Sequence, residues 1–269
     1  MNYKNLALTV YLAAISISCS NEAIDIIDES EQEIPDTTDS FKLVSKITTV
    51  GDDLTEHYSV FAYDDSHRMV SYADFGQKYV FEYGDNEKVA KAELYTGVVS
   101  SPDNYQRDGE MYFKYLDGKL TYSINGDRTE TFKYNLQNQV SEIESKSLTS
   151  EYYYTAKYTY ENDNISNMQF YNVYSASESE TSNLTFILDD KINPYNAIWL
   201  NYGFTIDIEF EPYGIYDFFL KHNPIEIYED GKLKMKAIYE YDSDNYPVSC
   251  RVTKYSNTGE RSYSVEFTY

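Results

Sequence analysis

The stretch Lys78-Tyr79-Val80-Phe81-Glu82-Tyr83 decides the fold of this chain. Its three aromatic rings occupy every second position; a lysine precedes the first ring, and a valine and a glutamate fill the two positions between the rings. Successive side chains of an extended strand point to opposite faces of a sheet, so the three rings share one face. Such a period of two is typical of a strand with one buried face.

This stretch ends in an aromatic triplet, two rings separated by one residue, that recurs along the chain. The copies are Phe61-Ala62-Tyr63, Phe81-Glu82-Tyr83, Phe113-Lys114-Tyr115, Phe132-Lys133-Tyr134, Tyr158-Thr159-Tyr160, Tyr239-Glu240-Tyr241 and Phe267-Thr268-Tyr269. A recurrence of this kind indicates repeated structural units. Each copy sets two rings side by side on one surface, so the sequence predicts a sheet with an aromatic face.

Turn-forming residues lie between the triplets. They include Asp117-Gly118, Asn125-Gly126, Asp230-Gly231 and Asn257-Thr258-Gly259. Because Asn-Gly readily takes positive φ angles, Asn125-Gly126 predicts a type I′ hairpin. A parallel sheet would need helical crossovers, and the sequence shows none. The predicted fold is all-β, a long antiparallel up-and-down meander that is either a curved open sheet or barrel-like.

The alternating pattern breaks between about Leu184 and Asn223. Here Asp189-Asp190-Lys191-Ile192-Asn193-Pro194-Tyr195 leads into Trp199, the only tryptophan of the sequence. Residues 212–222 lack alternation, which predicts a short irregular or helical insert. We expect the insert to pack against the sheet and the meander to restart at Asn223-Pro224.

The N-terminus predicts export. Lys4 supplies a positive charge, and the run from Leu6 to Ile17 supplies an apolar region shorter than the roughly 20 residues of a membrane-spanning helix. Residues 1–18 therefore have the pattern of a signal peptide. The following Ile15-Ser16-Ile17-Ser18-Cys19 resembles the lipobox of bacterial lipoproteins, with a serine where many lipoboxes have leucine. The resemblance implies that Cys19 becomes the acylated N-terminus.

Residues 19–40 predict a disordered tether, because they carry many acidic side chains and no basic one. The acidic residues are Glu22, Asp25, Asp28, Glu29, Glu31, Glu33, Asp36 and Asp39. Acidic residues behind a lipidated cysteine resemble the surface-export signal of Bacteroides-type lipoproteins. This resemblance implies an outer membrane lipoprotein at the cell surface rather than one that faces the periplasm. The β-meander domain then covers residues 41–269.

Several segments together resemble known families. The units Tyr63-Asp64-Asp65 and Tyr241-Asp242-Ser243-Asp244-Asn245-Tyr246-Pro247 look like the tyrosine-aspartate repeats of wall-associated and toxin-shell proteins. With the lipobox, the segment from Asp189 to Tyr195 and the Asn223-Pro224 step, they resemble more closely a Bacteroides lipoprotein family of unknown function. That resemblance implies a porin-like meander from about residue 40 onward. His67 and Asn245 stand where the tyrosine-aspartate repeats usually have glycine.

The formal net charge of −23 bears on the partners of the protein. Nucleic acid is not expected as a partner, because phosphate binding needs a cationic face. Contact with the lipid bilayer is expected through acylated Cys19. Once Cys19 is acylated, only Cys250 remains, so no intramolecular disulfide is expected.

The search for catalytic chemistry finds no motif. His57, His67 and His222 show no spacing that suggests a shared metal, so no metal and no cofactor are expected. We expect Cys250 to be a small strand residue rather than a nucleophile. Acidic turns such as Asp64-Asp65 could hold calcium through oxygen ligands, but none matches an EF-hand loop, and solvated turns are the expectation.

The aromatic residues supply the candidate ligand-binding side chains. Many of the 31 tyrosines must be partly exposed, because a phenol buried without a partner is costly. The row Tyr152, Tyr153 and Tyr154, and the pair Trp199 and Tyr202, could stack on sugar rings. The plainer alternative is that the tyrosines pair across strands and hold the sheet together.

The sequence therefore predicts a membrane-anchored, non-catalytic lipoprotein that acts as a surface or periplasmic interaction module for a glycan or protein ligand. One alternative is a carbohydrate-active hydrolase, which needs two carboxylates about 5 to 10 Å apart. A further alternative is an outer membrane β-barrel component. The strands carry frequent Lys, Glu and Asp residues, and the mean hydropathy is −0.59. Both features argue against a barrel embedded in the membrane, because its lipid-facing side chains would have to be apolar.

Overall fold

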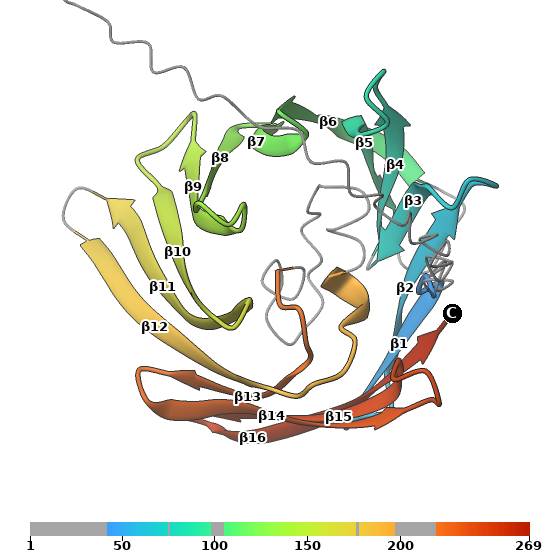
Figure 1. Ribbon diagram of the computed structural model, residues 1–269, viewed down its shortest axis with the longest axis vertical. Helices are drawn as coiled ribbons and strands as arrows, with labels where there is room; N and C mark the ends of the chain where they lie inside the picture. Colours follow the sequence, from blue (N-terminus) through green and yellow to red (C-terminus); the bar gives the residue numbers. More distant parts are fainter. Residues whose placement is uncertain (1–41, 75, 98–104, 176–177, 197–218) are drawn as a thin grey trace, which may run out of the picture. The chain divides into compact units, whose positions relative to one another are not determined.

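The computed structural model describes residues 42–74, 76–97, 105–175, 178–196 and 219–269. These residues form sixteen antiparallel strands that close into one barrel, in which each strand pairs with its sequence neighbours and β1 pairs with β16. Figure 1 shows the strands following one another around a ring, from β1 in blue to β16 in red. The predicted all-β antiparallel meander is confirmed, and it takes the barrel-like form. Among the described residues, no helix is long and apolar enough to cross a membrane.

The strands are β1 Lys46–Gly51, β2 Glu56–Tyr63, β3 Met69–Asp74, β4 Gln77–Tyr83, β5 Val89–Gly97, β6 Tyr105–Leu116, β7 Lys119–Asn125, β8 Arg128–Tyr134, β9 Val140–Ser147, β10 Tyr153–Glu161, β11 Asn164–Ser175, β12 Glu178–Leu188, β13 Pro224–Glu229, β14 Lys232–Tyr241, β15 Pro247–Ser256 and β16 Gly259–Thr268. The chain divides into residues Met1–Phe41 and a compact unit Lys42–Tyr269. The predicted signal peptide, the tether and Cys19 lie outside the described residues.

The buried face of the wall carries the first ring of most triplets. The buried first rings are Phe61, Phe81, Phe113, Phe132 and Tyr158. On neighbouring strands Phe132 pairs with Ile143, Ile143 with Ala156 and Ala156 with Phe170, so apolar side chains form a belt across the strands. Burial of this apolar surface is the main stabilising contribution to the fold.

The second ring of several triplets is a tyrosine that reaches a backbone carbonyl about one repeat unit away. The hydroxyls of Tyr83, Tyr134 and Tyr160 donate to the carbonyl oxygens of Met69, Leu120 and Val140 at 2.9, 2.8 and 2.7 Å. Tyr63 donates to Val44 O at 2.8 Å and Tyr269 to Pro247 O at 2.9 Å. These bonds satisfy half-buried phenols and tie consecutive hairpins together.

The tight turns follow the sequence prediction with one correction. Asp117 and Gly118 both have positive φ, of 51° and 76°, as a type I′ turn requires. The hairpin at Asn125-Gly126 exists, but Asn125 pairs with Arg128, so the two loop residues are Gly126 and Asp127. Gly126, with φ 56°, is the first of these two, the arrangement typical of a type II′ turn. The predicted type I′ turn is therefore wrong, because the strand register places Asn125 in β7.

The barrel closes near Lys42. Ser45 N donates to Thr268 O at 2.7 Å, which extends the ladder between β1 and β16. Lys42 Nζ lies 2.7 Å from Asp242 Oδ2 and 2.6 Å from Asp244 Oδ2, on the turn between β14 and β15. The first described residue is thus tied to a strand pair near the end of the sequence.

The connection between β12 and β13 enters the barrel. Its two described ends, residues 189–196 and 219–223, lie inside the ring of strands in Figure 1, in gold and orange. Phe219, only 6% exposed, packs edge-on against Tyr158 of β10 with ring centroids 5.6 Å apart. Tyr195 packs edge-on against Phe267 of β16 at 6.5 Å. The buried face of the strands is therefore the inner face of the barrel.

The two ends of this insert are joined to each other and to the wall. Asp189 Oδ1 accepts hydrogen bonds from the backbone amides of Lys191 and Asn223 at 2.9 and 3.1 Å. Asn193 Nδ2 donates to Leu220 O at 2.8 Å. The insert thus packs against the sheet. Of the predicted irregular stretch 212–222, residues 212–218 lie outside the described residues.

Candidate functional site

The outer face of β5 and β6 carries a charged cluster. Lys91 Nζ lies 3.0 Å from Glu93 Oε1 and 2.9 Å from Glu110 Oε1, across β5 and β6. Arg107 adds a contact to Glu93 at 3.2 Å. These residues alternate with buried ones such as Ala92 and Met111, so they belong to the outer face.

The outer face of β10, β11 and β12 differs, because it is polar but nearly free of charge. Nine outward side chains form three rows across the strands, and we call them the amide–hydroxyl panel. The rows are Thr155, Tyr171 and Thr181; Lys157, Gln169 and Asn183; and Thr159, Asn167 and Thr185. Lys157 is the one charged member of the panel.

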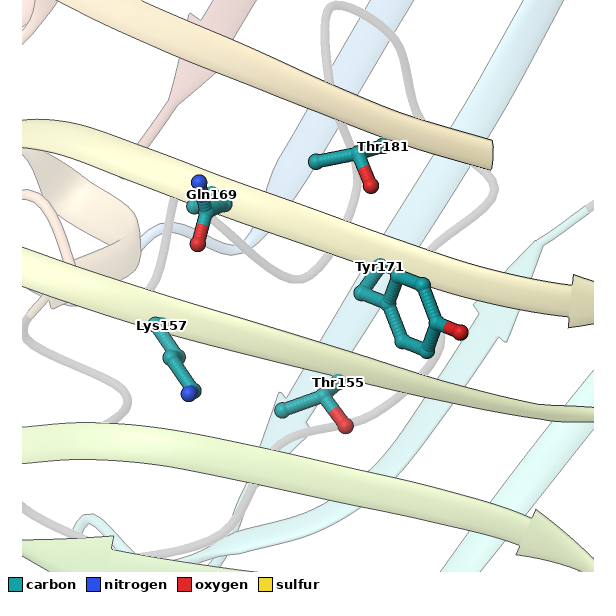
Figure 2. Close-up of a pocket in the computed structure, with 5 residues that line it drawn as sticks. All are labelled: Thr155, Lys157, Gln169, Tyr171 and Thr181. Carbon is teal, nitrogen blue, oxygen red and sulfur yellow. The ribbon is translucent and has the colours of Figure 1, made fainter. Parts of the chain in front are cut away.

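A shallow pocket of about 210 Å³ lies in the panel. It is lined by Thr155, Lys157, Gln169, Tyr171 and Thr181, and Figure 2 shows these five residues on neighbouring strands. The pocket combines hydroxyl and amide groups, which both donate and accept hydrogen bonds, with one aromatic ring and one amine. Its volume is below the about 300–1,000 Å³ of sites for drug-sized molecules.

The amides of Gln169 and Asn183 are held in place. Gln169 Nε2 donates to Asn183 Oδ1 at 3.2 Å, and Asn183 Nδ2 donates to Asp230 Oδ1 at 3.0 Å. This chain fixes which way the Gln169 amide faces. A ligand would therefore meet an oriented polar group on a rigid strand.

Lys157 is only loosely paired. Its Nζ lies 3.9 Å from Glu142 Oε2, while Lys133 is in direct contact with the other oxygen of Glu142. Such a long contact between exposed groups contributes little. The Lys157 amine can therefore turn toward a ligand at small cost.

Tyr153 borders the pocket through Tyr171. The two ring centroids are 6.0 Å apart with an interplanar angle of 58°, and the Tyr171 side chain is 39% exposed. Burial, and then hydrogen bonding with Tyr171, raise the pKa of Tyr153 above its ordinary value. The phenol stays neutral and keeps its hydrogen to donate.

The structure separates the three consecutive tyrosines of the predicted stacking row. Tyr153 lies on the outer face, whereas Tyr154 points inward and donates to Glu130 Oε1 at 3.0 Å. Tyr152, just before β10, packs against Tyr174 with centroids 5.9 Å apart. The row Tyr152-Tyr153-Tyr154 therefore does not form one platform, because adjacent residues of an extended chain alternate between faces. Trp199 and Tyr202 lie outside the described residues.

Sequence reasoning identified Tyr153 but missed the pocket residues. Thr155, Gln169 and Thr181 come from three strands, and only the register brings them together. One sequence signal was available. The outward positions of residues 155–185 carry amides and hydroxyls in a chain where 25% of residues are charged.

The carboxylates that the structure groups on β5 and β6 are poorly suited to acid catalysis. Hydrogen bonds from Tyr95 and Lys91 lower the pKa of Glu93 to about 2. Bonds from Tyr112 and Lys91 lower the pKa of Glu110 as well. A glycosidase needs one carboxylic acid with a raised pKa, so this pair lacks a proton donor at neutral pH.

The other candidate residues have structural contacts. Cys250 is buried on β15 opposite Val265 and Tyr239. His222 Nδ1 lies 2.8 Å from Lys191 O, within the insert. In the acidic turn at Asp64, Oδ1 accepts the backbone amides of Ser66 and Arg68. No group of three or more His, Cys, Asp or Glu side chains in the described ranges could hold a metal ion.

Comparison with known proteins gives a structural likeness. No family model matches the chain, and no curated protein matches it. A porin-like protein from Bacteroides uniformis has a TM-score of 0.53 and 16% identity, with 84% of this chain and 97% of that chain covered. A porin-like protein from Bacteroides vulgatus has a TM-score of 0.54 and 12% identity, with 84% and 98% covered. The chain is similar to these Bacteroides porin-like proteins in its fold.

Proposed function

We propose that this protein is a non-catalytic, glycan-binding barrel fixed to the outer membrane of a bacterium through acylated Cys19. The observation that carries the proposal is the pocket in the amide–hydroxyl panel, with Tyr171 as one of its walls. The C–H groups of a sugar ring stack on an aromatic face, and its hydroxyls pair with groups that both donate and accept. The panel offers both kinds of contact side by side.

The attachment rests on the sequence. The lipobox ending at Cys19 and the acidic residues behind it support export, acylation and display at the cell surface. The fold is similar to that of porin-like proteins from Bacteroides uniformis and Bacteroides vulgatus. Multiple acyl chains anchor firmly, because each buried methylene contributes about 0.8 kcal/mol.

The charges of the outer wall weigh against insertion of the barrel itself into a bilayer. A membrane-spanning barrel has an apolar band outside and polar residues inside. Here the outer face carries Lys91, Glu93, Arg107 and Glu110, while the belt of rings points inward. A charged side chain on the lipid face costs about 2–4 kcal/mol near the middle of the bilayer.

A glycan array tests the proposal. The probe is the unacylated protein, residues 19–269 with Cys19→Ala, which contains the whole compact unit Lys42–Tyr269. We expect binding to one class of glycan, lost in Tyr171→Ala and weakened in Gln169→Ala. Tyr112→Ala is the matched control, because Tyr112 is 44% exposed on the outer wall of β6, outside the panel. A hydrolysis assay on the bound glycan must show no turnover.

Two results would contradict the proposal. Turnover of a glycan without stable binding would point to the hydrolase. Equal loss of binding in Tyr112→Ala and Tyr171→Ala would remove the pocket from the binding surface. The anchor is tested separately by membrane fractionation of full-length Cys19→Ala, and unchanged membrane retention would refute acylation at Cys19.

A further inference from the structure

A second ring pair lies at the edge of the barrel, near the start of β10. Tyr152 precedes Tyr153 in the sequence, and it packs against Tyr174, whose side chain is 46% exposed. The guanidinium of Arg128 lies over the Tyr152 ring, 5.6 Å from its centroid. We call Tyr152, Tyr174 and Arg128 the rim cluster, because they sit where β8, β10 and β11 begin or end.

The rim cluster is on the other side of the wall from the pocket. Tyr154 contacts Glu130, and Tyr152 contacts Arg128. Tyr152 and Tyr154 are two positions apart, as are Arg128 and Glu130, so both contacts lie on the same face of the sheet. That face is the inner one, since Tyr154 alternates with the outward Tyr153. The two ring pairs are therefore linked through the consecutive residues Tyr152 and Tyr153 at the start of β10, one pair on the outer face and one at the inner edge.

The pocket alone holds little more than one sugar ring, given its volume of about 210 Å³. Tyr171 lies opposite Thr155 of β10, and from Thr155 to Tyr152 the chain runs three residues, about 10 Å of strand. An aromatic ring with hydrogen-bonding neighbours at each end of this distance suits a ligand with repeated rings. Arg128, Lys157 and the tyrosine hydroxyls supply donors along the way.

We propose that the two ring pairs are subsites for one extended oligosaccharide, which fills the pocket with one sugar and reaches over the barrel rim to stack on Tyr152 and Tyr174. This inference rests on the proposed function and adds the ligand class, a chain of several sugars rather than a single sugar or a terminal disaccharide. The pocket supplies binding at every ligand length. The rim cluster contributes only when the chain is long enough to span both sites.

Binding as a function of chain length tests the inference. The unacylated protein is titrated calorimetrically with cello-, xylo- and malto-oligosaccharides, each from the monosaccharide to the hexasaccharide. We expect affinity to rise with length and then level off. Tyr174→Ala should remove about tenfold of affinity for the longest ligands and leave the shortest unchanged. Tyr171→Ala should weaken ligands of every length.

The controls separate this inference from the proposed function. Tyr174 is exposed, so Tyr174→Ala should fold, and circular dichroism with an unchanged unfolding midpoint checks this. Arg128→Gln provides a second variant of the rim cluster with the same expected length dependence. Binding that is independent of length, or long ligands that bind Tyr174→Ala as tightly as the parent, would overturn the inference and leave glycan binding standing. Failure to bind any glycan would overturn both.

Discussion

Tyr241 donates its hydroxyl hydrogen to the carboxylate of Asp189, which joins the wall at β14 to the first residue of the insert. In other triplets the tyrosine in this position, such as Tyr134 or Tyr160, donates to a backbone carbonyl of a neighbouring strand. Burial, and then the Asp189 carboxylate, raise the pKa of Tyr241. One triplet thus uses its second ring to hold the insert instead of the preceding strand.

Removing this hydroxyl should loosen the insert. Tyr241→Phe should lower the free energy of unfolding by about 1.5 kcal/mol, because a hydrogen bond to a charged acceptor is lost at a half-buried site. Urea denaturation measures the change. Tyr228→Phe is the control, since Tyr228 also donates to a carboxylate, Glu226, at 2.6 Å, but on the outer face where water replaces it. If both variants lost the same free energy of unfolding, the Asp189 contact would contribute no more to stability than a solvent-exposed one.

The turn after β14 offers a test with an internal comparison. Asp242 Oδ1 accepts the backbone amides of Asp244 and Tyr246 at 2.9 and 3.0 Å. Asn135 does the same in the turn after β8, with the amides of Gln137 and Gln139 at 3.0 and 2.9 Å. Asp242→Asn should therefore keep the turn, while Asp242→Ala should lose it.

Thermal unfolding of the two Asp242 variants checks this expectation. We expect a small decrease of the midpoint for Asp242→Asn, which gives up only the charge beside Lys42, and a larger decrease for Asp242→Ala. Lys42 also contacts Asp244 at 2.6 Å, and Asp242→Asn should keep this contact because it keeps the turn. If the asparagine variant were as unstable as the alanine variant, the ion pair rather than the turn would be the stabilising element.

The strands could be predicted from sequence because alternation is a local property. Phe81 and Tyr83 show by their spacing alone that they share a face, and burial of Phe81 follows. Closure of the barrel is different, since it needs β1 to pair with β16, for example Ile47 with Phe267. No local pattern encodes that pairing. The same holds for the hairpin at Gly126, where Asn-Gly and Gly-Asp both suit a turn and only the register decides.

The binding surface could be predicted only in part for a related reason. Tyr153 stands out in the sequence, but its neighbour Tyr171 lies 18 positions later, and the pocket that Tyr171 lines depends on how β10 and β11 pair. Tyr154, adjacent in sequence, turns inward to Glu130. A row of tyrosines in a sequence therefore indicates aromatic content and not a shared platform.

An inward lysine should make stability rise with pH. Lys254 follows the alternation of buried Cys250 and Val252, and its Nζ lies 6.0 Å from the centroid of the Tyr263 ring. Burial lowers its pKa to about 8, below the about 10.4 of an unfolded lysine. Between these values the unfolded chain binds more protons, so the free energy of unfolding increases from about pH 8 to about pH 10.

Substitution of Lys254 should remove the loss of stability that comes from burying its charged amine. Lys254→Met should be more stable than the parent at about pH 7, and the difference should shrink toward about pH 10. Urea denaturation at a series of pH values measures it. Lys133→Met is the opposite control, because the Glu142 carboxylate raises the pKa of Lys133 and its removal should destabilise at neutral pH. A constant gain at all pH values would mean that packing, not charge, explains the Lys254 variant.

The inward tyrosines should set the alkaline limit of the fold. Burial raises the pKa of Tyr134 to about 12, and it raises those of Tyr115 and Tyr160 as well. A raised pKa means that the folded state favours the neutral phenol. The resulting stability is complete below about pH 10, where an unfolded tyrosine ionises, and it is lost as the pH rises from about 10 to about 12.

Tyrosinate absorbance after a rapid jump in pH should therefore show two phases. The fast phase comes from solvated phenols, and the slow phase coincides with loss of the β-sheet circular dichroism signal. Tyr134→Phe should reduce the amplitude of the slow phase only. Complete ionisation in one phase with the sheet still intact would show that these phenols are open to solvent.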